Sequence, residues 1–364
     1  MDVIKRMGLG VAPHKTEAMF FYKRSRGAPP PTDIMVGDVP VRVVPKMKYL
    51  GLTLDGHWEF GEHFRFLEPR VGRVAGALSR LLPNIGGPNA RVRALYANTV
   101  LSVLLYGAPV WTNVLAVNRT SRPLARRVQR RMAARAVRAY RTVSFAVVTA
   151  LAGMPPVDLL SRERADLYWG RKALVAGGEV PTASAVAEMK EGARARTVEE
   201  WRKLLDRPEM RDSYGVIEAV QPLLAEWAGE GHGAVISYRM AQVLTGHGCF
   251  GEFLCRIGKR ETGVCYHCGD ISDTVWHTLA RCPAWGEQRR VLVAHIGGDP
   301  TLSSLFGLML RSEEGWRAVS SFCEAVMSRK KEAARERERR RDRRGSGPGC
   351  SARQRGSRAS GLRG

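Results

Sequence analysis

The sequence has 364 residues, of which 44% are hydrophobic, so it is long enough for two or three domains and too apolar for a disordered chain. Lys and Arg total 58 against 35 Asp and Glu, and the net charge of +23 favours a polyanionic partner such as nucleic acid. The longest apolar run, residues 99–114, is interrupted by Tyr106, Gly107 and Pro109, and the first residues lack the apolar core of a signal peptide. We therefore expect an intracellular protein with no membrane partner.

Residues 1–56 have the pattern of a small β-rich segment. Apolar runs at 18–23, 39–44 and 47–54 are separated by Gly/Pro-containing turns at 27–31 and 37–38. This pattern predicts a small antiparallel set of strands that is too short to fold alone.

From Phe60 onward the apolar spacing becomes helical. Phe64, Leu67, Val71, Val74, Ala75, Leu78 and Leu81 recur at intervals of three and four residues and mark one helix face. Further helices are expected at about 90–105, 123–140, 158–176, 197–206, 214–227 and 234–244.

The helix expected over residues 123–140 is rich in arginine and contains no Asp or Glu. Because Arg can donate to two phosphate oxygens at once, we favour contact with nucleic acid over the alternative, a solvated helix paired with acids elsewhere. The arginines are Arg126, Arg127, Arg130, Arg131, Arg135 and Arg138.

Five of the seven cysteines lie within 34 residues, which is unlike a disulfide scaffold and fits a reducing compartment with one metal site. Cys265, Cys268, His277 and Cys282 have the spacing of a Cys-Cys-His-Cys zinc knuckle, and a fully ligated Zn²⁺ there would be structural. Two alternatives stay open: four unrelated residues in a Cys-rich stretch, or His267 as ligand in place of His277. Trp276 and Trp285 flank the site and could shield the ion or stack on bases.

The chain beyond residue 328 is of low complexity. Residues 329–364 carry 14 Lys and Arg and 4 Asp and Glu, first as an Arg/Glu run that could form a charged helix and then as a Gly/Ser/Arg stretch. We expect the last 20 residues to be disordered because they cannot bury apolar surface.

No set of catalytic carboxylates is evident. Two-metal nucleotidyl transfer needs paired aspartates, and the sequence has no Asp-Asp pair, P-loop or HExxH motif.

Several segments resemble the polyproteins of non-LTR retrotransposons, in particular the type-1 elements of arthropod ribosomal DNA. The segments GLGVAPHKTE (8–17), MKYLGLTLD (47–55) and LYG (105–107) resemble the reverse transcriptase, and GHGCF (246–250) with the knuckle resembles the region that follows it. The collinear resemblance covers roughly residues 5–290.

The resemblance implies a mostly α-helical α+β chain. The implied order is the end of the reverse transcriptase palm (1–56), a thumb-like helical domain (57–176), a helical connector (177–245), the knuckle (246–290), C-terminal helices (291–328) and a basic disordered tail (329–364). Lys48 and Tyr49 would belong to the hairpin that supports the primer end. Lys15 would lie near the incoming triphosphate, although an ordinary exposed lysine explains it equally well.

The resemblance also implies function. We expect the C-terminal part of an RNA-directed DNA polymerase that binds template RNA and target DNA, with an endonuclease in the parent polyprotein. Mg²⁺ is expected only in the full-length parent, and the isolated fragment is expected to be inactive. The protein would be nuclear during integration and cytoplasmic when assembled with RNA, and no oligomeric state is indicated. The alternatives are a non-catalytic zinc-knuckle nucleic-acid-binding protein and an RNA-packaging protein.

Overall fold

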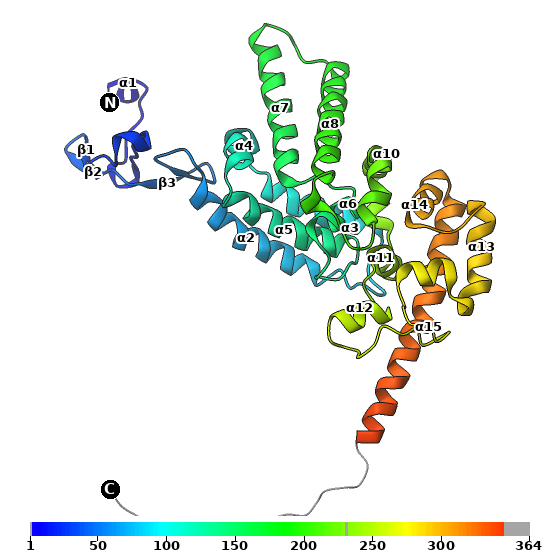
Figure 1. Cartoon of the computed structure of the whole chain (residues 1–364). Helices are drawn as coiled ribbons and strands as arrows, with labels where there is room; N and C mark the ends of the chain where they lie inside the picture. Colours follow the sequence, from blue (N-terminus) through cyan, green and yellow to red (C-terminus); the bar gives the residue numbers. More distant parts are fainter. Residues whose placement is uncertain (1, 230–231, 346–364) are drawn as a thin grey trace, which may run out of the picture.

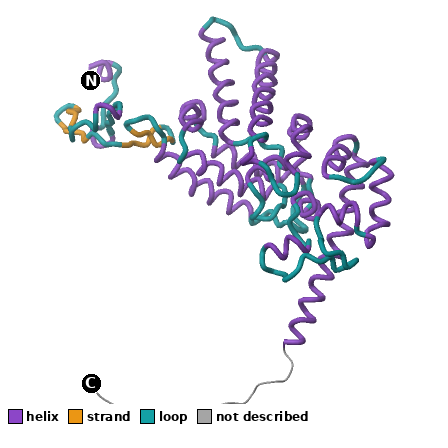
Figure 2. The backbone as a smooth tube through the Cα atoms, viewed as in Figure 1, coloured by secondary structure: helices purple, strands orange, loops and turns teal. Residues whose placement is uncertain are grey.

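The computed structural model describes residues 2–229 and 232–345. Within these ranges the chain is mostly helical and the strands lie near its N-terminal end, which confirms the expected α+β class (Figures 1 and 2). The longer helices are α2 (Gly61–Ser79), α3 (Ala90–Leu104), α4 (Ala108–Val117), α5 (Ser121–Ala136), α7 (Val157–Ala176), α8 (Ala183–Leu205), α13 (Gly286–Ile296), α14 (Leu302–Arg311) and α15 (Glu313–Gly345). The shorter helices are α1 (Asp2–Arg6), α6 (Phe145–Leu151), α9 (Val216–Val220), α10 (Leu224–Gly229), α11 (Tyr238–Thr245) and α12 (Gly251–Arg256).

Two antiparallel hairpins make up the β structure. β1 (Asp33–Val36) pairs with β2 (Val39–Arg42), and β3 (Lys46–Tyr49) pairs with β4 (Leu52–Asp55). The apolar run 47–54 is therefore a hairpin, because Leu50 and Gly51 at its centre both have positive φ, as a two-residue turn between strands requires. The run 18–23 forms no strand and contributes only a bridge from Ala18 to Val43.

The first hydrophobic core lies between α2, α3, α4, α5 and the β3–β4 hairpin. The helix face predicted from the spacing of apolar residues is confirmed at Phe64, Leu67, Val71 and Ala75, which are all buried. Leu81 was wrongly placed on this face: α2 ends at Ser79, and Leu81 is 69% exposed.

A second core joins α6, α9, α10, α11 and the C-terminal helices to the knuckle. Its buried residues run from Ala133 in α5 to Met327 in α15, so α5 contributes to both cores. The interior combines residues from the expected thumb-like, connector, knuckle and C-terminal segments, and the boundaries between those segments stay predictions.

Two helical features project from this body. α7 and α8 pack against each other as a long pair, and α15 extends away from the knuckle (Figure 1). The expected tail from residue 329 is helical as far as Gly345, because α15 is anchored by its buried face, which includes Phe322, Val326 and Met327. Residues 346–364, most of the stretch expected to be disordered, lie outside the described residues.

No single helix among the described residues is both long and apolar enough to span a membrane. By length and composition alone, α3 and α4 pass such a test together, although they meet at an angle of 83°.

Candidate metal centre and nucleic-acid interface

The structure brings the four predicted zinc ligands together. One ligand atom from each of Cys265, Cys268, His277 and Cys282 lies within 4.8 Å of all the others. The Sγ atoms of Cys265 and Cys282 are 3.9 Å apart, and Cys268 Sγ is 3.3 Å from His277 Nε2. Three thiols and one imidazole at these separations form a donor set that suits tetrahedral Zn²⁺.

Local backbone structure positions the four side chains. The amide of Cys265 donates to the carbonyl oxygen of Asp270 at 2.7 Å, and the amide of Gly269, at a φ of +82°, donates back to the carbonyl of Cys265 at 2.8 Å. This tight turn directs the first two cysteines to one side. His277 begins a short π-helical turn (His277–Arg281), and the amide of Cys282 donates to its carbonyl at 2.7 Å, which brings the last two donors side by side.

The surroundings of His277 determine which ring nitrogen faces the sulfur atoms. Its Nδ1 lies 3.4 Å from a carboxylate oxygen of Asp270, so Nε2 is directed at the cysteines. A carboxylate behind a ligand histidine fixes the ring orientation and increases its basicity. Desolvation lowers the pKa of His277, which favours the neutral imidazole that binds metal.

Cys265 and Cys282 are fully buried, and Cys268 is half-buried. Desolvation raises the pKa of the Cys265 thiol and raises that of Cys282 to about 12. Metal binding at this site would therefore displace protons from the thiols, as structural zinc sites require.

His267 lies outside the four-residue cluster. Its ring packs 4.6 Å from the ring of Trp285, measured between centroids. Trp285 is buried in the second core and is not available for base stacking, whereas Trp276 is 48% exposed and has the Arg281 guanidinium 4.0 Å from its ring centroid.

The predicted arginine helix corresponds to α5. Its arginines do not form the broadly exposed basic surface that was expected. Arg126 forms a paired contact with Asp158 at 2.9 and 2.7 Å, and Arg130 donates to the carbonyl oxygens of Val143 and Arg141. Arg138 lies beyond the end of α5, at a φ of +57°, and donates to the carbonyl oxygens of Ile236 and Pro88. These three arginines join segments of the fold.

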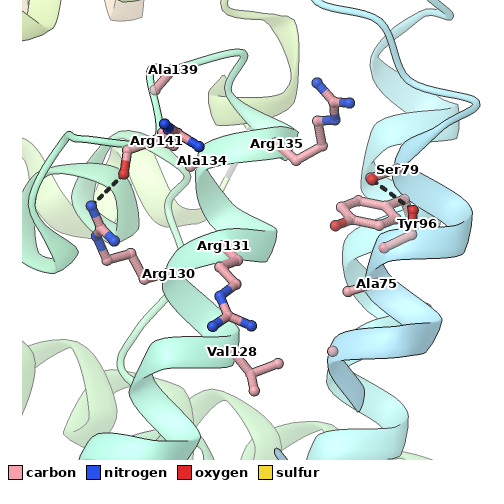
Figure 3. A pocket seen from close by; sticks show the side chains of 12 residues that line it. Ala75, Ser79, Tyr96, Val128, Arg130, Arg131, Ala134, Arg135, Ala139 and Arg141 are labelled. Atoms are coloured by element: carbon pink, nitrogen blue, oxygen red, sulfur yellow. Dashed lines mark hydrogen bonds between the residues drawn. The ribbon is translucent and has the colours of Figure 1, made fainter. Parts of the chain in front are cut away.

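Three arginines of this region remain available to an anion. Arg131 is 57% exposed in its side chain and lies 3.5 Å from Glu68, Arg127 is exposed, and Arg135 contacts Asn84 at 3.3 Å. Arg130, Arg131 and Arg135 also line a groove of about 450 Å³ between α2 and α5, together with Arg141 (Figure 3). The groove could accept an anionic backbone.

Arg93, which the sequence did not single out, joins the end of α5 to the loop after α2. Its side chain is fully buried, and it donates to the carbonyl oxygens of Arg135 and Pro83. Desolvation lowers its pKa to about 10. Neither the helix spacing nor the composition distinguishes this arginine from exposed ones.

The residues expected near a primer end lie close together at the N-terminal end of the molecule. Lys48 and Tyr49 are exposed on β3, and Lys48 lines a hollow of about 440 Å³ with His14 and Glu17. Lys15 is exposed in the short turn Pro13–Lys15 beside these residues.

Two sequence segments quoted for the resemblance contact each other. The hydroxyl of Tyr106 donates to the carbonyl oxygen of Leu50 at the tip of the β3–β4 hairpin, at 2.9 Å. Gly107 has a φ of +70° and lies close to Leu52. A β-carbon at position 107 would be 2.8 Å from the Leu52 side chain. The LYG segment therefore fixes the position of the hairpin.

Comparison with known proteins identifies relatives along most of the chain. The chain is 27% identical over 297 residues to the "Retrovirus-related Pol polyprotein from type-1 retrotransposable element R1 2" of Nasonia vitripennis. The aligned segment covers 79% of this chain and 71% of that protein. It is 28% identical over 294 residues to the corresponding R1 polyprotein of Bradysia coprophila. The chain is related to the Pol polyproteins of R1-type retrotransposable elements.

A third R1 relative extends this comparison. The "Putative 115 kDa protein in type-1 retrotransposable element R1DM" of Drosophila melanogaster is 26% identical over 295 residues. The chain spans 28% of the length of the Bradysia and Drosophila R1 proteins. No family model and no solved structure matches the chain. The resemblance to R1-type retrotransposons found in the sequence is confirmed.

Proposed function

We propose that this chain is the C-terminal part of a retrotransposon RNA-directed DNA polymerase and binds template RNA and target DNA. The relation to R1 Pol polyproteins supports this proposal, as does the positive charge of the sequence. Such a protein would act in the nucleus during integration and reside in the cytoplasm while it assembles with RNA.

The observation that carries this proposal is the convergence of Cys265, Cys268, His277 and Cys282 in a chain related to Pol polyproteins. These residues would hold one Zn²⁺ ion, which would cross-link the segment 265–282. Because protein atoms fill all four positions, the ion would have no open position for substrate and would act in folding.

In this proposal the β3–β4 hairpin would be the end of a polymerase palm, and the helices after it would form a thumb. Lys48 and Tyr49 would support the primer strand from the hairpin that Tyr106 holds in place. Lys15 would lie toward the triphosphate. Arg127, Arg131 and Arg135 would contact the backbone of the template–primer duplex, with Arg126, Arg130 and Arg138 holding the helices that present them.

Catalysis belongs to the longer polyprotein in this proposal. Nucleotidyl transfer by two Mg²⁺ ions needs paired aspartates, and this sequence has no Asp-Asp pair. The endonuclease would likewise be part of the parent protein. The four clustered ligand residues also support a second candidate function, a zinc-knuckle protein that binds nucleic acid without catalysis.

Primer extension tests the assignment of catalysis. On an RNA template with an annealed DNA primer, Mg²⁺ and all four deoxynucleotides, we expect no extension by this chain. We expect extension by a longer protein that includes the residues encoded upstream. Extension by this chain alone would contradict the proposal, and no extension by the longer protein would favour the non-catalytic function.

A further inference from the structure

A second basic groove lies between the knuckle and α15, away from the arginines of α5. It has a volume of about 750 Å³. One wall is the loop after α12 together with Tyr266, and the other wall is α15. The lining residues that matter here are Lys259, Arg260, Tyr266, Lys331, Arg335 and Arg337.

The groove has an excess of positive charge. Its basic side chains are Lys259, Arg260, Lys331, Arg335 and Arg337, and its acidic side chains other than Asp273 are Glu261 and Glu338. Asp273 forms an ion pair with Lys330 at the base of the groove. Lys259, Arg335 and Arg337 are exposed, so the groove can attract an anion without the cost of desolvating buried charges.

Planar groups are stacked along this groove. The guanidinium carbon of Arg260 lies 3.5 Å from the ring centroid of Tyr266, and that of Arg337 lies 3.2 Å from it. Two guanidinium groups this close to one ring must occupy its opposite faces. Arg337 also donates to the carbonyl oxygen of Tyr266 at 3.3 Å, and the tyrosine is 45% exposed. The result is an Arg-Tyr-Arg stack in which Arg260 is partly buried and Arg337 is exposed.

A buried ion pair fixes the two walls relative to each other. The Lys330 ammonium of α15 contacts a carboxylate oxygen of Asp273, and their side chains are 1% and 3% exposed. The other carboxylate oxygen of Asp273 accepts from the amide of Gly251 at 2.9 Å, and the Lys330 ammonium lies 5.0 Å from the ring centroid of Phe250. The groove is therefore formed before any ligand arrives.

We propose that this groove binds a single-stranded stretch of nucleic acid. Phosphates would lie against Lys259, Lys331 and Arg335, and a base would stack on the outer face of the exposed Arg337 guanidinium. Planar side chains in a basic groove recognise unpaired bases, because the bases of a duplex are already stacked on each other. The inference rests on the proposed nucleic-acid binding and adds to it the strandedness of the partner and the residues that contact it.

The test measures binding of fluorescent oligouridine, oligothymidine and a DNA duplex of equal length by fluorescence anisotropy, using the whole chain with zinc bound. Because the α5 arginines would also contact a duplex, the groove is reported by the change in affinity on substitution of Arg337, which should be larger for either single strand than for the duplex. Arg337→Ala should weaken single-strand binding by about tenfold, the effect of losing one stacked base. Arg337→Lys, which keeps the charge and loses the planar group, should also weaken it.

Arg339→Ala is the matched control, since Arg339 is exposed on the same helix and does not line the groove. It should change affinity by no more than about twofold, the effect of a distant surface charge. Equal losses for Arg337→Ala and Arg339→Ala, or a loss in Arg337→Ala that is as large for the duplex as for the single strands, would each overturn the inference and leave nucleic-acid binding itself intact. If none of the three probes bound, the proposed function would fail as well.

Discussion

Replacing Cys268 with serine is expected to abolish zinc binding and to unfold the knuckle. The substitution leaves three ligands in a site that the structure builds from four, with Cys268 Sγ only 3.3 Å from His277 Nε2. Structural zinc contributes about 10–16 kcal/mol of apparent binding free energy in zinc-finger peptides, so the expected effect is large. Zinc content per chain, measured by atomic emission after gel filtration, should fall from one ion to nearly none.

Two matched variants separate loss of a ligand from general damage. Cys255→Ser removes a thiol of the same region that lies outside the cluster, and His267→Asn removes the histidine that the spacing alone left as an alternative. Both should retain full zinc content. Unchanged zinc in Cys268→Ser, or loss of zinc in His267→Asn with retention in His277→Asn, would show that this ligand set is wrong.

The second large effect is expected at the buried ion pair between α15 and the knuckle. In Lys330→Met the carboxylate of Asp273 stays buried at 3% exposure with no cation beside it. Breaking a buried pair by removing one partner costs about 3–5 kcal/mol, because the remaining charge is left uncompensated. The free energy of unfolding, measured in urea by tryptophan fluorescence, should fall by about that amount.

The charge at position 273 provides the control for this prediction. Asn in place of Asp273 keeps an oxygen that can accept from the Gly251 amide, so Lys330→Met combined with Asp273→Asn should recover most of the lost stability. Arg329→Met, an exposed neighbour on α15, should change stability by less than about 0.5 kcal/mol. A loss below about 1 kcal/mol in Lys330→Met would mean that the pair does not anchor the helix.

The cluster of Cys265, Cys268, His277 and Cys282 was predictable from the sequence because it depends on short-range spacing. A Cys-x2-Cys turn places two thiols on one side, and a His and a Cys on the following turn supply the other two donors. Spacing favoured His277 as the ligand but left His267 open as an alternative. The position of each histidine depends on the Asp270 carboxylate behind His277 and on the packing of His267 against Trp285, and both contacts exist only in the folded segment.

The arginine helix shows why a charged pattern does not determine function. Six arginines without a neighbouring acid suggested an exposed basic strip, yet the partner of Arg126 is Asp158, 32 residues away. Arg138 donates to the carbonyl of Ile236, 98 residues away. Backbone carbonyls at loop ends leave no signal in composition, so periodicity alone cannot separate an arginine that joins elements from one that faces a ligand.

The region after residue 328 was only partly predictable. The Arg/Glu composition indicated a charged, solvated segment, and the structure continues α15 through it as far as Gly345. The apolar residues Val319, Phe322, Val326 and Met327 follow a helical spacing in the sequence and end close to Lys330, which completes the buried face. Tracing that spacing across the expected boundary would have extended the helix, but the partner Asp273 and the basic groove could come only from the fold.

The dependence of nucleic-acid affinity on salt tests the central claim that this chain binds nucleic acid through its basic surface. The measurement is the Kd for a primed RNA template at increasing salt, with the zinc-loaded protein. For about five phosphate contacts to a single strand, affinity should fall on the order of a hundredfold between about 50 and about 200 mM salt, as a straight line in log Kd against log salt. A flat line, or no binding at the lowest salt, would contradict the account.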